Sequence, residues 1–187
     1  MHQVQTSVAN IGDTAMFRAL YPRIDGRTEK VLIIDDDAAS RLAIAAAIRE
    51  GGYALSFSTS AAEARKQLPK LEPDVIVCDL MMDEVAGDEF IRWLSEQEQW
   101  KFVPVVAVTL LDDPVVRVDL LEAGAHAVLS KSAVRRELRA NVEAALRTRR
   151  LFRDYCANGE RGAERSTPRR ADDQADPSNL SGLVAGE

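Results

Sequence analysis

Short runs of apolar residues recur between residues 29 and 150, and amphipathic stretches separate them. The runs are KVLIID at 30–35, YALSFS at 53–58, DVIVCD at 74–79, VPVVAVT at 103–109 and HAVLSK at 126–131. The first, third and fourth runs are continuously apolar, which is typical of parallel strands covered on both faces. The second run alternates apolar and polar residues and the fifth is short, so we expect these two at the edges of a sheet.

Start and stop signals flank the amphipathic stretches. The start signals are Ser60 with Glu63 as a capping box, an acidic pair before proline at 112–114, and Ser132 before the last helix. Glycine stop signals lie at 50–52 and 122–125. Five strands that alternate with five helices predict an α/β fold, a doubly wound five-stranded parallel sheet with helices on both faces.

Composition and charge narrow the class of protein. The chain has 187 residues, is 46% hydrophobic and carries a net charge of −6, so we expect a globular core and no general affinity for nucleic acid. No apolar run approaches the ~20 residues of a membrane span, and the N-terminus lacks a signal-peptide pattern. Two cysteines, Cys78 and Cys156, cannot form a disulfide framework, so we expect a cytoplasmic protein.

The chain divides into three zones. We expect an N-terminal extension at 1–28 and one domain at 29–150, whose last helix continues to about 156. Residues 157–187 contain almost no large apolar side chains, which is typical of a disordered tail. No effector domain fits into that tail, so we expect a stand-alone domain whose output is a protein contact.

Polar residues stand at the carboxyl ends of four predicted strands. They are Asp35, Asp36 and Asp37 after the first, Asp79 at the end of the third, Thr109 at the end of the fourth and Lys131 after the fifth. Ligands of open parallel sheets bind at this edge. Clustered carboxylates can coexist around Mg²⁺. One carboxylate can then attack a phosphoryl donor to give an acyl phosphate, while a lysine and a hydroxyl bind the phosphoryl oxygens.

The order and spacing of these residues resemble the receiver domain of bacterial two-component response regulators. The matching motifs are IIDDD at 33–37, DLMMDEVAG at 79–87, VT at 108–109 and a lysine after the AGA turn at 123–125. The resemblance implies a flavodoxin-like or CheY-like sheet with strand order 2-1-3-4-5. It also implies Asp79 as the phosphoacceptor and a Mg²⁺ site formed by Asp35, Asp36, Asp79 and the backbone carbonyl of Met81.

The resemblance assigns further roles around this site. Thr109 and Lys131 match the pair that binds the phosphoryl group, and Gly87 matches the glycine that turns the loop into the third helix. Asp37 is expected to cap the first helix rather than to bind the ion.

Several positions depart from the family pattern. Asp83 replaces a loop proline, and Ser132 replaces the proline after the lysine. Leu110 is large where the family has a small residue, and Val128 replaces the aromatic residue that usually rotates on activation. Met81 and Leu111 flank the phosphoryl site by resemblance. Both are apolar, so they cannot hydrogen-bond an attacking water, and we predict slow dephosphorylation.

The resemblance also implies partners. A histidine kinase or phosphotransfer protein would donate the phosphoryl group, and a downstream protein would receive the signal. The helix after 112–114, the strand at 126–131 and the last helix would form the output face and a surface for a homodimer. The last helix is strongly basic, which fits either a solvated face or a partner surface; nucleic-acid binding is the weaker interpretation.

Two other functions remain open from the residues alone. Leu110, Ser132 and Val128 favour a receiver-like adaptor that works without phosphorylation. The DDD motif at 35–37 also satisfies the D-x-D pattern of haloacid-dehalogenase-type phosphatases. That alternative leaves Asp79 and Gly87 unexplained, and Ala39 stands where those phosphatases commonly have threonine.

Overall fold

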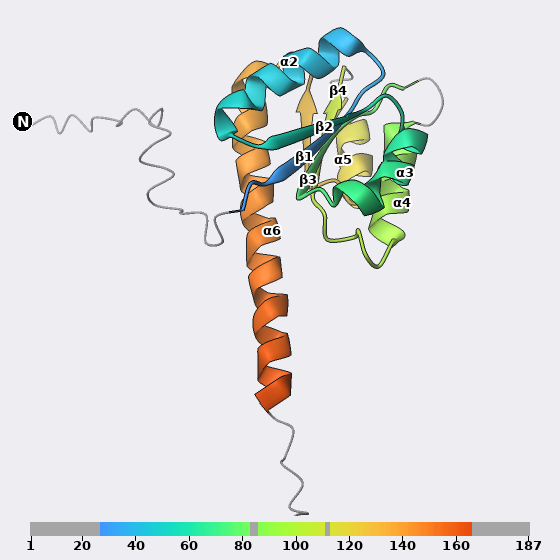
Figure 1. Cartoon of the computed structure of the whole chain (residues 1–187). Helices are drawn as coiled ribbons and strands as arrows, with labels where there is room; N and C mark the ends of the chain where they lie inside the picture. The colour runs from blue at the N-terminus through green and yellow to red at the C-terminus, as the bar shows by residue number, and fades with distance from the viewer. Residues whose placement is uncertain (1–26, 83–85, 111–112, 166–187) are drawn as a thin grey trace, which may run out of the picture. The chain divides into compact units, whose positions relative to one another are not determined.

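The described residues contain one five-stranded parallel sheet (Figure 1). The structure, a computed structural model, describes residues 27–82, 86–110 and 113–165. The strands are β1 (Lys30–Ile34), β2 (Ala54–Ser58), β3 (Val75–Asp79), β4 (Val105–Thr109) and β5 (Ala127–Ser130). They lie in the order β2-β1-β3-β4-β5, and each neighbouring pair is parallel. The predicted strand order and the two predicted edge strands are confirmed.

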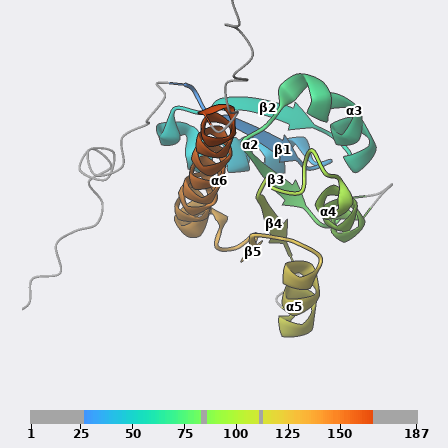
Figure 2. The same ribbon diagram turned by 90° about the horizontal axis from the view of Figure 1, so that it is seen from below.

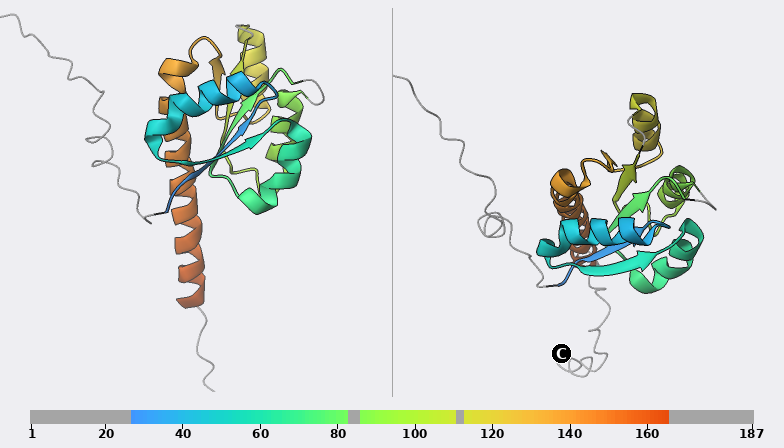
Figure 3. Two further views of the ribbon diagram at one scale, coloured as in Figure 1. Left: turned by 45° about the horizontal axis from the view of Figure 1, so that its top comes forward. Right: turned by 90° about the horizontal axis from the view of Figure 1, so that it is seen from above.

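Helices cover both faces of this sheet. They are α2 (Ala38–Ile48), α3 (Ala61–Leu71), α4 (Gly87–Glu96), α5 (Pro114–Glu122) and α6 (Val134–Arg165), and a 3-10 turn, η1 (Arg49–Gly51), follows α2. Apolar residues of α2 and α6 pack with Val31 and Ile33 of β1, while those of α3, α4 and α5 pack with Leu32 and Ile34. Successive β1 residues thus enter cores on opposite faces. Figures 2 and 3 show α6 on one side of the sheet and α4 on the other.

Side chains fix the helix starts that the sequence predicted. Asp37, Ser60 and Asp113 each accept a hydrogen bond from a backbone N–H in the first turn of α2, α3 and α5, respectively. These caps satisfy N–H groups that have no partner within the helix. The predicted glycine stops are also present, because Gly52 and Gly124 have φ values of 66° and 113°, where side chains beyond glycine are strained.

The side of α6 that faces the sheet is apolar and buried. Four residues on this face are each at most 6% exposed: Val134, Leu138, Val142 and Ala145. The predicted Ser132 cap is wrong by one position, because α6 begins at Val134 and Ser132 lies before the N-cap. The Ser132 hydroxyl lies 2.9 Å from that of Ser130 instead.

The last helix is longer than the sequence predicted. α6 continues to Arg165, so neither the expected end at about 156 nor the expected disorder of 157–165 holds. Composition indicates only the lack of burial, whereas each residue added to an existing helix gains a backbone hydrogen bond, and alanine, glutamate and arginine in 157–165 offset the unfavourable Asn158, Gly159 and Gly162. By its contacts the chain divides after Leu151, and the rest of α6 belongs to the second unit. Residues 1–26 and 166–187, which hold most of the expected extension and tail, lie outside the described residues.

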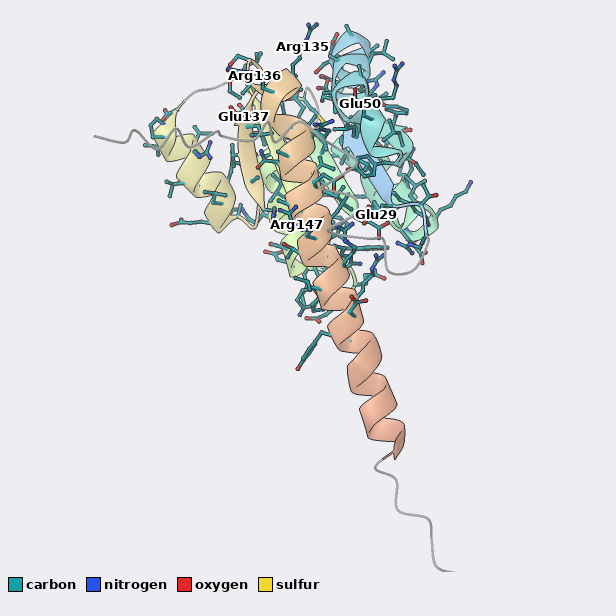
Figure 4. The ribbon with its side chains drawn as sticks, turned by 90° about the vertical axis from the view of Figure 1, so that its left-hand side faces the viewer. Glu29, Glu50, Arg135, Arg136, Glu137 and Arg147 are labelled. Carbon is teal, nitrogen blue, oxygen red and sulfur yellow. The ribbon has the colours of Figure 1, made fainter. Side chains whose placement is uncertain are left out.

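The basic face of α6 is partly paired and partly open to solvent (Figure 4). Two of its arginines bind carboxylates at 2.6 Å: Arg139 binds Glu50, and Arg150 binds the buried Glu29. Arg135 and Arg136 in the first turn are exposed and border a groove against α2. Among the described residues, no helix combines the length and apolar character that crossing a membrane requires.

Candidate functional site

Three aspartates meet at the carboxyl edge of the sheet. Asp35 and Asp36 follow β1, and Asp79 ends β3, the strand that pairs with β1. One carboxylate oxygen of each lies within 4.8 Å of the other two. Asp35 and Asp79 are buried, whereas Asp36 is exposed. The sequence placed these carboxylates at one edge, and the folded chain brings them into one cluster.

Asp35 is fully buried, and both of its carboxylate oxygens have hydrogen-bond donors. Oδ1 accepts the backbone N–H of Asp37 at 2.9 Å. Oδ2 accepts the hydroxyl of Ser40 at 2.5 Å and the ammonium group of Lys131 at 3.2 Å. A charged group can remain in the interior only with such partners. Asp35 therefore anchors the start of α2 to the loop that carries Lys131.

Asp79 faces the same cluster from β3 and is 1% exposed. Its Oδ1 accepts the backbone N–H of Met81 at 3.3 Å, and its Oδ2 accepts the Lys131 ammonium group at 2.7 Å. Gly87 begins α4 directly against this residue. A Cβ atom at position 87 would lie 2.3 Å from the backbone oxygen of Asp79, so the start of α4 can approach the end of β3 this closely only with glycine there.

Lys131 reaches the aspartates because β4 and β5 hold the preceding residues in register. Thr109 pairs with Ser130 across the two strands, and the backbone N–H of Lys131 donates to the Thr109 carbonyl at 2.7 Å. Thr109 is 2% exposed. Lys131 therefore binds the side chains of Asp35 and Asp79 directly. Thr109 is joined to Lys131 through a backbone hydrogen bond.

Burial and charge oppose each other at this site. Desolvation raises the pKa of Asp79, assisted by the charge of Asp35, although the hydrogen bond and charge of Lys131 act in the other direction. Desolvation lowers the pKa of Lys131, but the hydrogen bonds and charges of Asp79 and Asp35 outweigh it, so the net shift is upward. The lysine stays charged, and the two buried carboxylates repel each other.

Two residues close in the sequence to Asp79 and Thr109 have exposed apolar side chains. The side chains of Met81 and Leu110 are 55% and 68% exposed, so both are large apolar groups in contact with solvent. Val128 is buried in β5 and packs with the core beneath α3, α4 and α5. Leu111 and Asp83 lie outside the described residues, so their predicted roles are not tested.

The loop after Lys131 departs from the family pattern in the way the sequence suggested. The described residues contain no cis peptide bond. The hydroxyls of Ser130 and Ser132 lie 2.9 Å apart, and the Ser130 hydroxyl accepts the Ser132 N–H at 3.4 Å. Two serines thus bracket Lys131 where the family has a proline.

The donor set fits a hard divalent cation. Mg²⁺ prefers carboxylate, carbonyl and water oxygens, and three carboxylates against one lysine leave the cluster net negative. Asp36 and Asp79 would hold such an ion together with Asp35. The backbone carbonyl of Met81 as a further ligand stays a prediction.

Sequence reasoning missed two residues of α2 that support the acidic loop. Besides the Ser40 contact with Asp35, the guanidinium group of Arg41 donates to the backbone carbonyls of Asp35 and Asp36 at 2.5 and 3.0 Å. Their positions in the first turn after the Asp37 cap could have indicated that they face back toward the loop. Pattern reasoning considered only the residues at strand ends.

The sequence matches a known family. A family model for the response regulator receiver domain covers residues 31–143. Response regulator MprA of Mycobacterium ulcerans is 31% identical over 129 residues, which make up 69% of this chain and 55% of that protein. The phosphate regulon transcriptional regulatory protein PhoB of Pseudomonas aeruginosa is 31% identical over 117 residues, 63% of this chain and 51% of that protein. The chain spans about half the length of these curated relatives.

Solved structures agree with this match. The receiver domain of Francisella response regulator 1452 has a TM-score of 0.59 and 27% identity, covering 64% of this chain and 98% of that one. The signal receiver domain of a histidine kinase from Syntrophus aciditrophicus has a TM-score of 0.59 and 29% identity, covering 64% and 90%. The fold, the order of the site residues and the family match agree, and this chain belongs to the receiver-domain family of response regulators.

Proposed function

We propose that this protein accepts a phosphoryl group on Asp79 from a histidine kinase or phosphotransfer protein, with Mg²⁺ bound. The buried carboxylate of Asp79 carries this proposal. It belongs to a three-aspartate cluster and accepts a hydrogen bond from Lys131 at 2.7 Å. A carboxylate nucleophile next to a fixed cation is suited to phosphoryl transfer, because the cation offsets charge that develops on the phosphoryl oxygens.

The transfer is a simple displacement. An oxygen of Asp79 attacks the phosphorus of a phosphohistidine, the P–N bond breaks, and the imidazole leaves with the electron pair and takes up a proton. An acyl phosphate on Asp79 results. The ammonium group of Lys131 and the hydroxyl of Thr109 bind its phosphoryl oxygens. Mg²⁺ held by the three aspartates and the Met81 carbonyl supplies further positive charge.

Hydrolysis of this acyl phosphate would be slow. Water must reach the phosphorus, and a side chain that hydrogen-bonds the water helps to orient it. Met81, beside Asp79, is apolar, and so is Leu111, two residues after Thr109. Neither can orient water, and the exposed Leu110 adds apolar bulk near the entrance.

The signal would leave through protein contacts at α5, β5 and α6. The apolar side chains of Val115, Val118 and Leu121 on α5 are 65%, 51% and 43% exposed, which suits a surface for a downstream protein or a second copy. Because Val128 replaces the usual aromatic residue, the switch would move other groups. We place this activity in the cytoplasm, where histidine kinases present their phosphorylated residues.

A receiver-like adaptor that works without phosphorylation is the second candidate. The 68% exposure of Leu110 favours it, because a bulky group at the entrance hinders a donor. A haloacid-dehalogenase-type phosphatase is less consistent with the site, because the side chain of Asp37 caps α2 and Asp79 would have no role.

Incubation with a small phosphodonor, acetyl phosphate, and Mg²⁺ tests the leading proposal. Intact mass should increase by one phosphoryl group in the wild-type protein and in Asp37→Asn, which keeps a good helix cap. The increase should be absent in Asp79→Asn. The proposal would be contradicted if Asp79→Asn were phosphorylated as well as Asp37→Asn. It would also be contradicted if neither the wild type nor Asp37→Asn were phosphorylated.

A further inference from the structure

We propose that Ser40 is a positioning residue whose hydrogen bond partly offsets the charge of Asp35 and thereby sets the Mg²⁺ affinity of the site and the position of Lys131. This inference rests on the proposed function, because it concerns the same cluster. It adds a residue that neither the strand-end pattern nor the family motifs identify.

The role of Ser40 depends on a short hydrogen bond to a buried side chain. The Ser40 hydroxyl donates to Oδ2 of Asp35 at 2.5 Å, and the Asp35 side chain is fully buried. The cap geometry of α2 makes this contact possible, since the Ser40 backbone N–H donates to the Asp37 side chain at 2.6 Å. Ser40 is therefore held from two sides, and its hydroxyl has a defined acceptor.

The same Asp35 oxygen also receives Lys131. The Lys131 ammonium group lies 3.2 Å from Oδ2 of Asp35 but 2.7 Å from Oδ2 of Asp79. Two carboxylates thus compete for one cation. The Ser40 hydroxyl already satisfies part of Oδ2 of Asp35, so the lysine can approach Asp79, the proposed phosphoacceptor, more closely.

Removing the Ser40 hydroxyl should leave the negative charge of the cluster less compensated. If Lys131 stays beside Asp79, Asp35 loses a donor and its buried charge is less compensated. If Lys131 moves toward Asp35, Asp79 loses its donor instead. In either case the three aspartates hold more uncompensated charge, and a divalent cation should bind more tightly.

The direction of the change in Mg²⁺ affinity distinguishes a positioning role of Ser40 from a purely structural one. If Ser40 only supported the local fold, its loss would loosen the acidic loop and weaken Mg²⁺ binding. A hydrogen bond that offsets the charge of Asp35 predicts the opposite change. Alanine is also a better helix former than serine, so Ser40→Ala should leave α2 intact.

The test is a calorimetric titration of the full chain with MgCl₂, so it needs no phosphodonor. We expect Ser40→Ala to lower the Kd for Mg²⁺ by about three- to tenfold, because a hydrogen bond to a charged group is lost. Ser40→Thr, which keeps a hydroxyl, should have the same Kd for Mg²⁺ as the wild type. Ser95→Ala is the matched control, because the Ser95 hydroxyl bonds the Arg92 carbonyl in α4, away from the cluster.

Two results would overturn the proposal in distinguishable ways. An unchanged or weaker Mg²⁺ affinity in Ser40→Ala, with a wild type that binds Mg²⁺, would remove the role of Ser40 alone. A wild type without saturable binding, or with binding that Asp36→Asn leaves unchanged, would remove both the proposed metal site and the role of Ser40.

Discussion

The ammonium group of Lys131 lies 2.7 Å from Oδ2 of Asp79 and joins two residues that are 52 positions apart in the sequence. The contact forms because β3, β4 and β5 are parallel and end at the same edge. It places a fixed cation at a buried carboxylate, and the proposed chemistry depends on that pair.

The charge of Asp79 should lower the stability of the protein when Mg²⁺ is absent. Burial raises the pKa of Asp79 in the folded state. The contribution of Asp79 to the free energy of unfolding is therefore most favourable below its unfolded pKa and is lost as the pH rises through its folded pKa. Asp79→Asn should therefore be about 1–2 kcal/mol more stable than the wild type at pH 7. Urea unfolding in EDTA measures this difference, which should shrink toward pH 4. A variant less stable than the wild type at pH 7 would contradict this account.

Loss of Lys131 should leave two buried carboxylates without their cation. We expect Lys131→Met to lower the free energy of unfolding by about 2–3 kcal/mol in EDTA at pH 7. Asp79→Asn should stabilise this variant by more than it stabilises the wild type, because without Lys131 the buried charge of Asp79 has lost its cation. Urea unfolding of the four proteins forms a double-mutant cycle. Additive effects of the two substitutions would show that the contact carries no coupling.

Gly87 should be sensitive to the smallest side chain. A Cβ atom there would lie 2.3 Å from the Asp79 backbone oxygen and 2.7 Å from Cα of Leu80. Gly87→Ala should displace the loop after β3, cost about 1–3 kcal/mol of stability and slow phosphorylation by acetyl phosphate. Asp88→Ala, at the exposed neighbouring position, is the control and should change neither quantity. A phosphorylation rate in Gly87→Ala equal to that of the wild type would argue against the close approach of position 87 to Asp79.

Leu110 should hinder access to the site without supporting the fold. Its side chain is 68% exposed, so Leu110→Ala should alter the free energy of unfolding by no more than about 0.5 kcal/mol. The same change should speed phosphorylation by acetyl phosphate severalfold because it opens the entrance. Rates from intact mass against time measure this effect. A rate equal to that of the wild type would mean that Leu110 does not limit access.

Slow hydrolysis can be tested at Met81. After removal of the donor, the acyl phosphate of Met81→Asn should decay faster than that of the wild type, because the amide can hydrogen-bond an attacking water. The exposed position of Met81 makes the substitution compatible with folding. Equal decay of the two phosphoproteins would place the control of hydrolysis elsewhere.

The strand-end residues and the sheet could be predicted because they depend on simple patterns. Continuous apolar runs such as VLII before Asp35 are buried on both faces, and parallel strands bring their carboxyl ends together. The contact of Ser40 with Asp35 could not be predicted in this way. It depends on how the Asp37 cap orients one turn of α2, which a spacing rule does not specify.

The ends of α6 show the limits of composition more directly. Ser132 has the chemistry of a helix cap, but its hydroxyl contacts Ser130, and the helix begins one residue later than predicted. At the other end, the shortage of apolar residues after 156 predicted disorder, yet the helix continues to Arg165. Helix extension depends on backbone hydrogen bonds as well as on burial.

The most direct test of the account is the location of the phosphoryl group. After treatment with acetyl phosphate and Mg²⁺, peptide mass spectrometry should find it on Asp79 alone, and EDTA should abolish the modification. A phosphoryl group on Asp35, Asp36 or any other residue, or modification of Asp79 that is unaffected by EDTA, would contradict the central claim.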